Sequence, residues 1–261
     1  MYRISQLSVR FGTHVLLHSL SAELQGGQLC MVVGPNGAGK TTLLKCLDGE
    51  IQPTKGVIEF NDQPLDQWPT KELAKARAVL SQSSSLEFPF TVQDVVLMGR
   101  LPHDTSSECD LEIVIEVLDL CDCSHLAQRA FPTLSGGEQQ RVQTARVLAQ
   151  VWREHFAQDR FLLLDEPISA LDLSHQHSLL RLLKHLTRSQ GVGVLCTLHN
   201  LNLAAQYADR CLILDQGRLV ADGAASEVFT EETISNVFDL DIWLNHHPQD
   251  PSIPLIVPRI T

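Results

Sequence analysis

Short apolar runs recur along this chain and alternate with segments of helical periodicity. The runs at 28–34 (QLCMVVG), 160–167 (RFLLLDEP) and 192–199 (VGVLCTLH) predict buried parallel strands, the last ending at His199. Between the last two, the segment HSLLRLLKHL predicts a helix with four leucines on one face: Leu179, Leu180, Leu183 and Leu186. Strands interleaved with helices in this way predict an α/β domain.

Other patterns add strands and turns to this domain. Residues Tyr2 to Leu24 alternate apolar and polar positions around FGTH, which predicts strands near a sheet edge. TTLLKCLDG predicts a helix closed by Gly49, and GVIEF predicts a further strand. CLILDQGRLVADG predicts a β-hairpin that turns at Gln216 and Gly217.

The pattern becomes helical in the middle of the chain, from about Phe88 to Gln150. TVQDVVLMGR and DLEIVIEVLDLCD predict two helices, and a third is predicted to begin at Ser135. The chain shows no internal repeat, so we expect these helices to form one mostly helical insert in the α/β domain.

Composition and charge limit the class of function. The 261 residues carry a net charge of -11, which argues against a nucleic-acid partner and against electrostatic docking on an anionic membrane. No apolar run approaches the roughly 18 residues of a spanning helix, and MYRISQLSVRFG lacks a signal-peptide core. The seven cysteines are scattered, with Cys121 and Cys123 the only close pair, which favours reduced cytosolic thiols. Any membrane role must therefore come through a partner protein.

A complete phosphate-binding motif, GPNGAGKT, spans Gly34 to Thr41. It follows an apolar strand and precedes a helix, which is the context that the motif requires. Its backbone N–H groups can cradle a β-phosphate, Lys40 can neutralise β- and γ-phosphate oxygens, and Thr41 can ligate Mg²⁺. The motif therefore predicts a nucleotide-binding site.

Two carboxylates end the run FLLLDE at the edge where ligands bind in open α/β sheets. We expect Asp165 to hold Mg²⁺ through water and Glu166 to act as the general base toward an attacking water. The alternative is an acidic pair that caps the helix after Pro167. The phosphate motif upstream favours the catalytic interpretation.

Two further polar residues lie at predicted strand ends. His199 could reach the same sheet edge and contact a γ-phosphate, although a single histidine is more often structural. Gln82, after AVLS, could touch Mg²⁺ or the attacking water, although by itself it is only a polar residue at a strand end.

A second glycine-rich helix start lies far from the phosphate motif, in LSGGEQQR. Ser135 and Glu138 match a capping box, and the two glycines between them would let a ligand approach the backbone closely. Such a helix N-terminus favours a phosphate. One ATP does not need two sites of this kind.

The motifs together resemble one family. The phosphate loop, Gln82, LSGGEQQR, LLLDEP, SALD and His199 occur in the order seen in ATP-binding cassette (ABC) ATPases, across essentially the whole chain. The resemblance implies a P-loop NTPase (RecA-like) core with an N-terminal antiparallel β-subdomain and an inserted α-helical subdomain. It implies one domain over 1–261, with its core at 1–87 and about 155–261 and the helical subdomain at about 88–154.

The resemblance also assigns roles around ATP and Mg²⁺. The catalytic residues would be Glu166, His199, Gln82 and Lys40. The magnesium ligands would be Thr41, Gln82 and Asp165. The ATP-binding residues would be Phe11, Gly34, Pro35, Asn36, Gly37, Ala38, Gly39, Lys40, Thr41 and Thr42. Phe11 would stack on adenine where the family more often has tyrosine, with a core phenylalanine as the alternative.

The same resemblance implies a head-to-tail homodimer with two ATP molecules at its interface. Each ATP would lie between the phosphate loop of one copy and Ser135, Gly136, Gly137 and Glu138 of the other. Asp172 in SALD would cross that interface. The second glycine-rich helix start would then serve the ATP of the other copy.

Three segments resemble one branch of the family. TVQDVVLMGRLPH (91–103) resembles the region that iron-chelate, haem and cobalamin importers use against their permeases, and QVWREHFAQD (150–159) and the tail HHPQDPSIPLIVP resemble haem importers. The resemblance implies a peripheral ATPase subunit at the cytoplasmic face of the inner membrane that energises haem import. Its partners would be two permease subunits and, indirectly, a periplasmic substrate-binding protein. Siderophore iron and cobalamin are the alternative substrates.

Histidines do not add a haem site to this picture. His246 and His247 lie in a polar tail, and His175 and His177 diverge on a helix, so we expect surface histidines. A rival of another class is a soluble ABC ATPase switch, such as one in iron–sulfur cluster assembly. The GRLPH segment favours the importer and disfavours an exporter.

Overall fold

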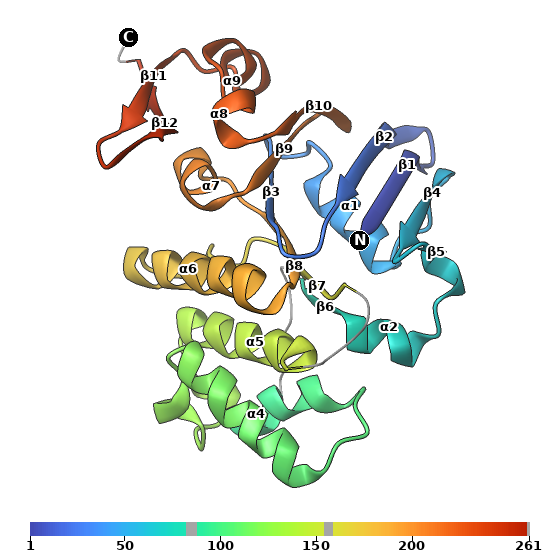
Figure 1. Cartoon of the computed structure of the whole chain (residues 1–261), viewed down its shortest axis with the longest axis vertical. Helices are drawn as coiled ribbons and strands as arrows, with labels where there is room; N and C mark the ends of the chain where they lie inside the picture. Colours follow the sequence, from blue (N-terminus) through green and yellow to red (C-terminus); the bar gives the residue numbers. More distant parts are fainter. Residues whose placement is uncertain (82–87, 154–158, 260–261) are drawn as a thin grey trace.

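The computed structural model describes residues 1–81, 88–153 and 159–259 (Figure 1). The strands are β1 (Tyr2–Phe11), β2 (His14–Leu24), β3 (Leu29–Val33), β4 (Lys55–Phe60), β5 (Gln63–Pro64), β6 (Arg77–Leu80), β7 (Phe161–Leu164), β8 (Gly193–Thr197), β9 (Arg210–Asp215), β10 (Arg218–Gly223), β11 (Ile242–His247) and β12 (Asp250–Pro258). The helices are α1 (Lys40–Asp48), α2 (Thr70–Ala76), α3 (Val92–Leu97), α4 (Ser107–Leu120), α5 (Gly136–Val151), α6 (Leu173–Gln190), α7 (Leu201–Tyr207), α8 (Ala225–Val228) and α9 (Glu231–Phe238). Short 3₁₀ turns cover η1 (Leu65–Gln67), η2 (Met98–Arg100), η3 (Ser124–Leu126) and η4 (Phe131–Thr133).

The central sheet has the strand order β10-β9-β3-β8-β7-β6 within the described residues. Its strands run parallel from β9 to β6, and β10 adds an antiparallel edge. Strand β3 lies in the middle, where Met31 is level with Cys196 of β8 and Cys211 of β9. All five residues of β3 are buried, because both faces of the sheet are covered. The predicted α/β fold is confirmed.

A second sheet, in the order β2-β1-β4-β5, is antiparallel throughout the described residues. Its inner face and α1 share a core with one face of the central sheet. Tyr2, Phe60 and Phe161 form an aromatic contact there, with ring centroids 4.6 to 5.9 Å apart. This sheet is the predicted N-terminal antiparallel subdomain.

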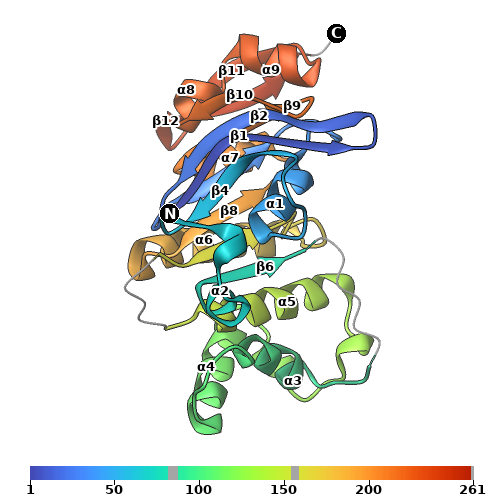
Figure 2. The same cartoon turned by 90° about the vertical axis from the view of Figure 1, so that its right-hand side faces the viewer.

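Helices α3, α4 and α5 gather at one end of the molecule (Figures 1 and 2). Helix α5 packs against α3, α4, β6 and β7. The buried residues of these helices form one continuous core with the other face of the central sheet. The helical insert is therefore as predicted, while its boundaries near residues 87 and 154 lie beside or within undescribed ranges and stay predictions.

Residues 242–258 form a β-hairpin at the opposite end of the molecule from α3–α5 (Figure 2). The interpretation of this stretch as a polar tail is wrong, because Ile242 and Ile256 pack into the main core. The side-chain amide of Asn202 in α7 fixes the hairpin by donating to the carbonyl of Ile256 at 3.0 Å and accepting from its N–H at 2.8 Å. His246 remains exposed on strand β11.

Two local predictions hold at the level of the backbone. Helix α1 ends at Gly49, which has φ of 80° and closes the helix by donating to the carbonyl of Cys46. The β9–β10 hairpin turns at Gln216 and Gly217 with φ of 44° and 74°, as a two-residue hairpin turn requires.

Within the described residues, no helix is both long and apolar enough to span a bilayer.

Candidate nucleotide-binding site

The phosphate loop connects β3 to α1, as the motif predicts. Gly34 lies so close to β9 that a Cβ atom there would be 2.1 Å from the carbonyl oxygen of Leu214. Gly39 has φ of 100°, and a Cβ atom there would be 2.8 Å from Cδ2 of Leu17. Gly37 also has a positive φ of 79° but faces open space. Two of the glycines are therefore required by close packing, and the third lets a ligand approach the backbone.

Lys40 closes the loop on itself. Its Nζ donates to the carbonyl oxygens of Gly34 at 2.8 Å and Pro35 at 3.0 Å. Burial lowers the pKa of Lys40, while the carboxylates of Glu166 and Asp165 oppose that shift. The ammonium group thus sits within the loop, where phosphate oxygens can replace the two carbonyls.

Two cavities meet at the phosphate loop. One of about 240 Å³ is lined by Asn36 to Thr42 together with Leu16, Glu166 and His199. The other, of about 370 Å³, is lined by Thr41, by Asp165 and by further residues of α1 and β6. The structure therefore brings five of the predicted residues to one place: Lys40, Thr41, Asp165, Glu166 and His199.

The donor set at the second cavity fits Mg²⁺. The Thr41 hydroxyl and the Asp165 carboxylate are hard oxygen donors, and Mg²⁺ is commonly held by one or two protein oxygens plus phosphates and waters. Among residues 1–81, 88–153 and 159–259, no group of three or more His, Cys, Asp or Glu side chains is placed to hold a metal ion. Gln82, the third predicted magnesium ligand, lies outside the described residues.

A buried threonine joins the two carboxylate residues. The Thr197 hydroxyl donates to Oδ1 of Asp165 at 2.6 Å and accepts from the backbone N–H of Glu166 at 2.9 Å. Glu166 has φ of 48°, a left-handed conformation that is unfavourable for a residue with a side chain. Thr197 thereby holds the backbone of Glu166 in a strained conformation that turns the chain at the sheet edge.

His199 and Glu166 meet although they follow different strands. Nε2 of His199 lies 2.6 Å from Oε1 of Glu166. Strand β8 ends at Thr197, two residues earlier than the sequence predicts, so His199 lies on the loop that follows. The interpretation of Glu166 as a helix cap loses support, because its carboxylate contacts His199.

The second glycine-rich helix start forms the predicted capping box. The Ser135 N–H donates to Oε2 of Glu138 at 2.7 Å, and the Ser135 hydroxyl accepts from the Glu138 N–H at 3.4 Å. The pKa of Glu138 is lowered by the hydrogen bonds that its carboxylate accepts, first from the Ser135 N–H and then from the Ser135 hydroxyl at 2.8 Å. Among the described residues that line the two cavities at the phosphate loop, none belongs to this segment.

The two glycines of this segment have different surroundings. A Cβ atom on Gly136 would meet nothing within 4 Å, which fits the predicted approach of a ligand. A Cβ atom on Gly137 would lie 3.1 Å from the carbonyl oxygen of Ala170. Gly137 therefore lets α5 pack closely against the loop after Glu166, which the sequence did not predict.

Two interface predictions fall on exposed residues. Phe11 is 80% exposed, so the alternative of a core phenylalanine is wrong. Asp172 caps α6 by accepting from the His175 N–H at 2.9 Å. His175 and His177 are half-buried at the surface, where their Nδ1 atoms lie 2.8 Å from Oδ1 of Asp172 and from the Tyr207 hydroxyl, respectively.

The segment GRLPH is largely structural. The guanidinium of Arg100, 2% exposed, donates to the carbonyl of Ala149 at 2.8 Å and to Asp110 at 2.8 Å. Nε2 of His103 lies 2.8 Å from the carbonyl oxygen of Gln150. These side chains close the C-terminus of α5, whose last carbonyls have no partner within the helix. Leu101 between them is 80% exposed.

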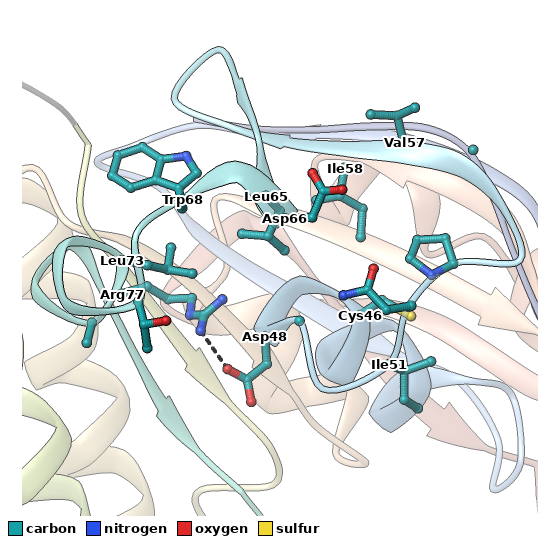
Figure 3. A pocket seen from close by; sticks show the side chains of 16 residues that line it. Cys46, Asp48, Ile51, Val57, Ile58, Leu65, Asp66, Trp68, Leu73 and Arg77 are labelled. Atoms are coloured by element: carbon teal, nitrogen blue, oxygen red, sulfur yellow. Dashed lines mark ion pairs between the residues drawn. The ribbon is translucent and has the colours of Figure 1, made fainter.

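A further cavity lies apart from the predicted residues. It has a volume of about 500 Å³ between α1, β4 and α2 and contains an ion pair of 2.8 Å between Asp48 and Arg77 (Figure 3). Burial raises the pKa of Asp48, against the lowering effect of Arg77. No predicted site residue lines the described part of this cavity.

Comparisons with known proteins agree with this site. The family model described as ABC transporter matches residues 17–169. The chain is 48% identical over 259 residues to the hemin import ATP-binding protein HmuV of Pseudomonas aeruginosa, covering 99% of this chain and 100% of that protein. The corresponding protein of Gloeobacter violaceus is 46% identical, with 99% of this chain and 94% of that protein covered.

Solved structures show the same architecture. A metal-chelate type ABC transporter in an inward-facing conformation is 30% identical, with a TM-score of 0.82 and coverage of 99% of this chain and 97% of that chain. A dimeric bacterial ABC transporter cassette is 24% identical, with a TM-score of 0.75 over 86% of this chain and 99% of that chain, and so shows the fold alone.

Proposed function

Because the chain belongs to the ABC transporter family, as one of its ATP-binding and ATP-hydrolysing subunits, we propose that it energises the import of haem. The observation that carries the substrate is near-full-length identity of 45 to 48% to three hemin import ATP-binding proteins. The transported molecule is handled by a permease and a binding protein, so this chain contributes the energy of ATP.

The site supports a division of labour around ATP. The phosphate-loop N–H groups and Lys40 would hold the phosphates. Thr41, Asp165 and Gln82 would hold Mg²⁺, and the ion would supply positive charge to the phosphate oxygens. Glu166 polarises the attacking water, and its carboxylate is oriented by the 2.6 Å contact with His199. His199 lines the same cavity as the phosphate loop, which supports a contact between His199 and the γ-phosphate.

The separation of the phosphate loop from the Ser135–Glu138 helix start supports a homodimer. The phosphate loop lines one pair of cavities, while Ser135 to Glu138 form an open helix start elsewhere. Two copies arranged head to tail would place this start on the ATP of the other copy, with Asp172 crossing the interface and exposed Phe11 stacking on adenine. ATP would then stabilise the closed dimer, and hydrolysis would release it.

Exposed apolar side chains support docking on a permease. Phe88 and Phe90 precede α3, Leu101 follows it, and they are 70%, 40% and 80% exposed. Exposed aromatic and aliphatic residues of this kind favour a protein partner. Two copies would bind two permease subunits from the cytoplasmic face of the inner membrane, and the periplasmic binding protein would act through the permease.

ATPase activity of the purified chain with its permease in lipid vesicles tests this function. We expect haem-loaded binding protein to stimulate hydrolysis, and carriers loaded with siderophore iron or cobalamin to have no effect. Stimulation by another carrier instead would replace haem as the substrate. Basal hydrolysis with no response to any permease or carrier would contradict the importer and support a soluble ABC switch.

A further inference from the structure

Helix α5 is hydrogen-bonded directly to the turn that carries Glu166. The side-chain amide of Gln140 donates to the carbonyl oxygen of Pro167 at 3.0 Å. Pro167 is buried, so its carbonyl needs a partner from the protein. We propose that Gln140 is a positioning residue that couples the two ATP sites of the dimer, an inference that rests on the proposed function.

Glu166 is held from both sides. On its N-terminal side the Thr197 hydroxyl accepts from the Glu166 N–H at 2.9 Å. On its C-terminal side Gln140 holds the carbonyl of the next residue, Pro167. A left-handed φ of 48° persists only where the surroundings fix it, so loss of either contact would let the carboxylate leave its position beside His199.

Gln140 belongs to the helix whose N-terminus would contact the partner's ATP. Helix α5 begins with the Ser135–Glu138 capping box, and Gln140 lies two residues after Glu138 on the same rigid helix. Gly137 packs against Ala170 just beyond the Glu166 turn. A displacement of the helix start by the partner's nucleotide would therefore be carried to the turn that acts on the protomer's own nucleotide.

The neighbouring glutamine contacts a different part of the molecule. The amide of Gln139 donates to the carbonyls of Leu134 at 3.3 Å and Phe131 at 3.4 Å, within the helical insert. Gln176 of α6 holds the loop after Pro167 by donating to the carbonyls of Ile168 and Leu171. Among the contacts described for this loop, Gln140 supplies the side-chain hydrogen bond from α5.

The test compares Gln140→Glu with Gln139→Glu in the complex of full chain and permease in vesicles. Both substitutions keep the size of the side chain and remove its N–H donors. We expect Gln140→Glu to lower kcat about two- to thirtyfold, the range of coupling mutations, and to bring the Hill coefficient for ATP down to about 1. ATP affinity of the isolated chain and its Tm should match those of Gln139→Glu, which should keep cooperative hydrolysis.

Three results would overturn the coupling. Wild-type cooperativity in Gln140→Glu would remove the role of the hydrogen bond. A lower kcat with an unchanged Hill coefficient would limit Gln140 to its own site. A wild-type Hill coefficient of 1 would show that there is nothing to couple. The response of the wild-type complex to haem-loaded binding protein, measured in the same vesicles, tests the proposed function separately.

Discussion

Nε2 of His199 lies 2.6 Å from Oε1 of Glu166, and the two residues come from loops after different strands of the central sheet. The contact orients the carboxylate toward the cavity that the phosphate loop also lines. A general base must be both near its proton and correctly oriented, and for the proposed base Glu166 this contact would provide the orientation.

Replacement of Glu166 by glutamine tests the base. The substitution Glu166→Gln keeps the size of the side chain but removes the charge that attracts the water proton, so turnover should fall by about 10²- to 10⁴-fold. Binding of ATP should persist and should trap the closed dimer, which size-exclusion chromatography with ATP and Mg²⁺ would detect. Near-normal turnover would refute this role.

Replacement of Thr197 by valine tests the buried bridge. The variant keeps the shape but leaves the Glu166 N–H and the Asp165 carboxylate without the hydroxyl that joins them. We expect a loss of about 1–3 kcal/mol in the free energy of unfolding, together with a lower kcat. Thr197→Ser retains the hydroxyl and serves as the control in denaturant titrations. Equal stability of the two variants would show that the bridge does not matter.

Alanine substitutions distinguish the roles of the two glycines, Gly136 and Gly137, at the second helix start. Gly136→Ala should stabilise the folded chain by about 0.5–1 kcal/mol, because the site is open and alanine favours a helix. The same variant should weaken ATP-dependent hydrolysis if phosphate approaches there. Gly137→Ala should gain less or lose stability, because its Cβ lies 3.1 Å from the Ala170 carbonyl. Thermal unfolding of both variants measures the difference, and identical shifts would contradict it.

Asp110→Asn tests the buried pair that closes α5. Burial raises the pKa of Asp110, but hydrogen bonds from Arg100 and Thr105 lower it more, so this pKa lies below its usual range. Removing the charge should cost about 2–3 kcal/mol, somewhat less than a fully broken buried pair, since Arg100 keeps its bond to Ala149.

The pH dependence of this cost has a definite sign. A carboxyl whose pKa is lowered by folding stabilises the protein above its unfolded pKa, about 3.9. The stability gap between the wild-type chain and Asp110→Asn should therefore be full near neutral pH. It should shrink as the pH falls through the folded pKa. A gap that stays constant into strong acid would show that Asp110 does not act through its charge.

Prediction from the sequence succeeded where local pattern and chemistry coincide. GPNGAGKT marks a strand, a loop and a helix at once, so Lys40 and Thr41 could be placed without a structure. Glu166 and His199 could be predicted to share an edge, because carboxyl ends of parallel strands meet there. Thr197 was missed because it lies inside an apolar run, where a polar β-branched residue is consistent with an ordinary strand position.

Contacts between distant segments could not be predicted. Arg100 and His103 were interpreted as part of a permease-facing segment, yet they bond to carbonyls at the end of α5, about fifty positions along the chain. The β11–β12 hairpin was missed because three prolines, Pro251, Pro254 and Pro258, interrupt the strand pattern of β12. In both cases the partner is set by tertiary packing, which a local pattern does not contain.

The position of β3 in the central sheet has a consequence for how the chain folds during its synthesis. The strand that delivers the phosphate loop is flanked by β8 and β9, which come from residues 193–197 and 210–215. A ribosome therefore releases the complete phosphate motif long before it releases either strand that holds the loop in shape. Because pairings this distant in sequence form slowly, refolding should be slow, and ATP binding should be acquired late, together with the sheet.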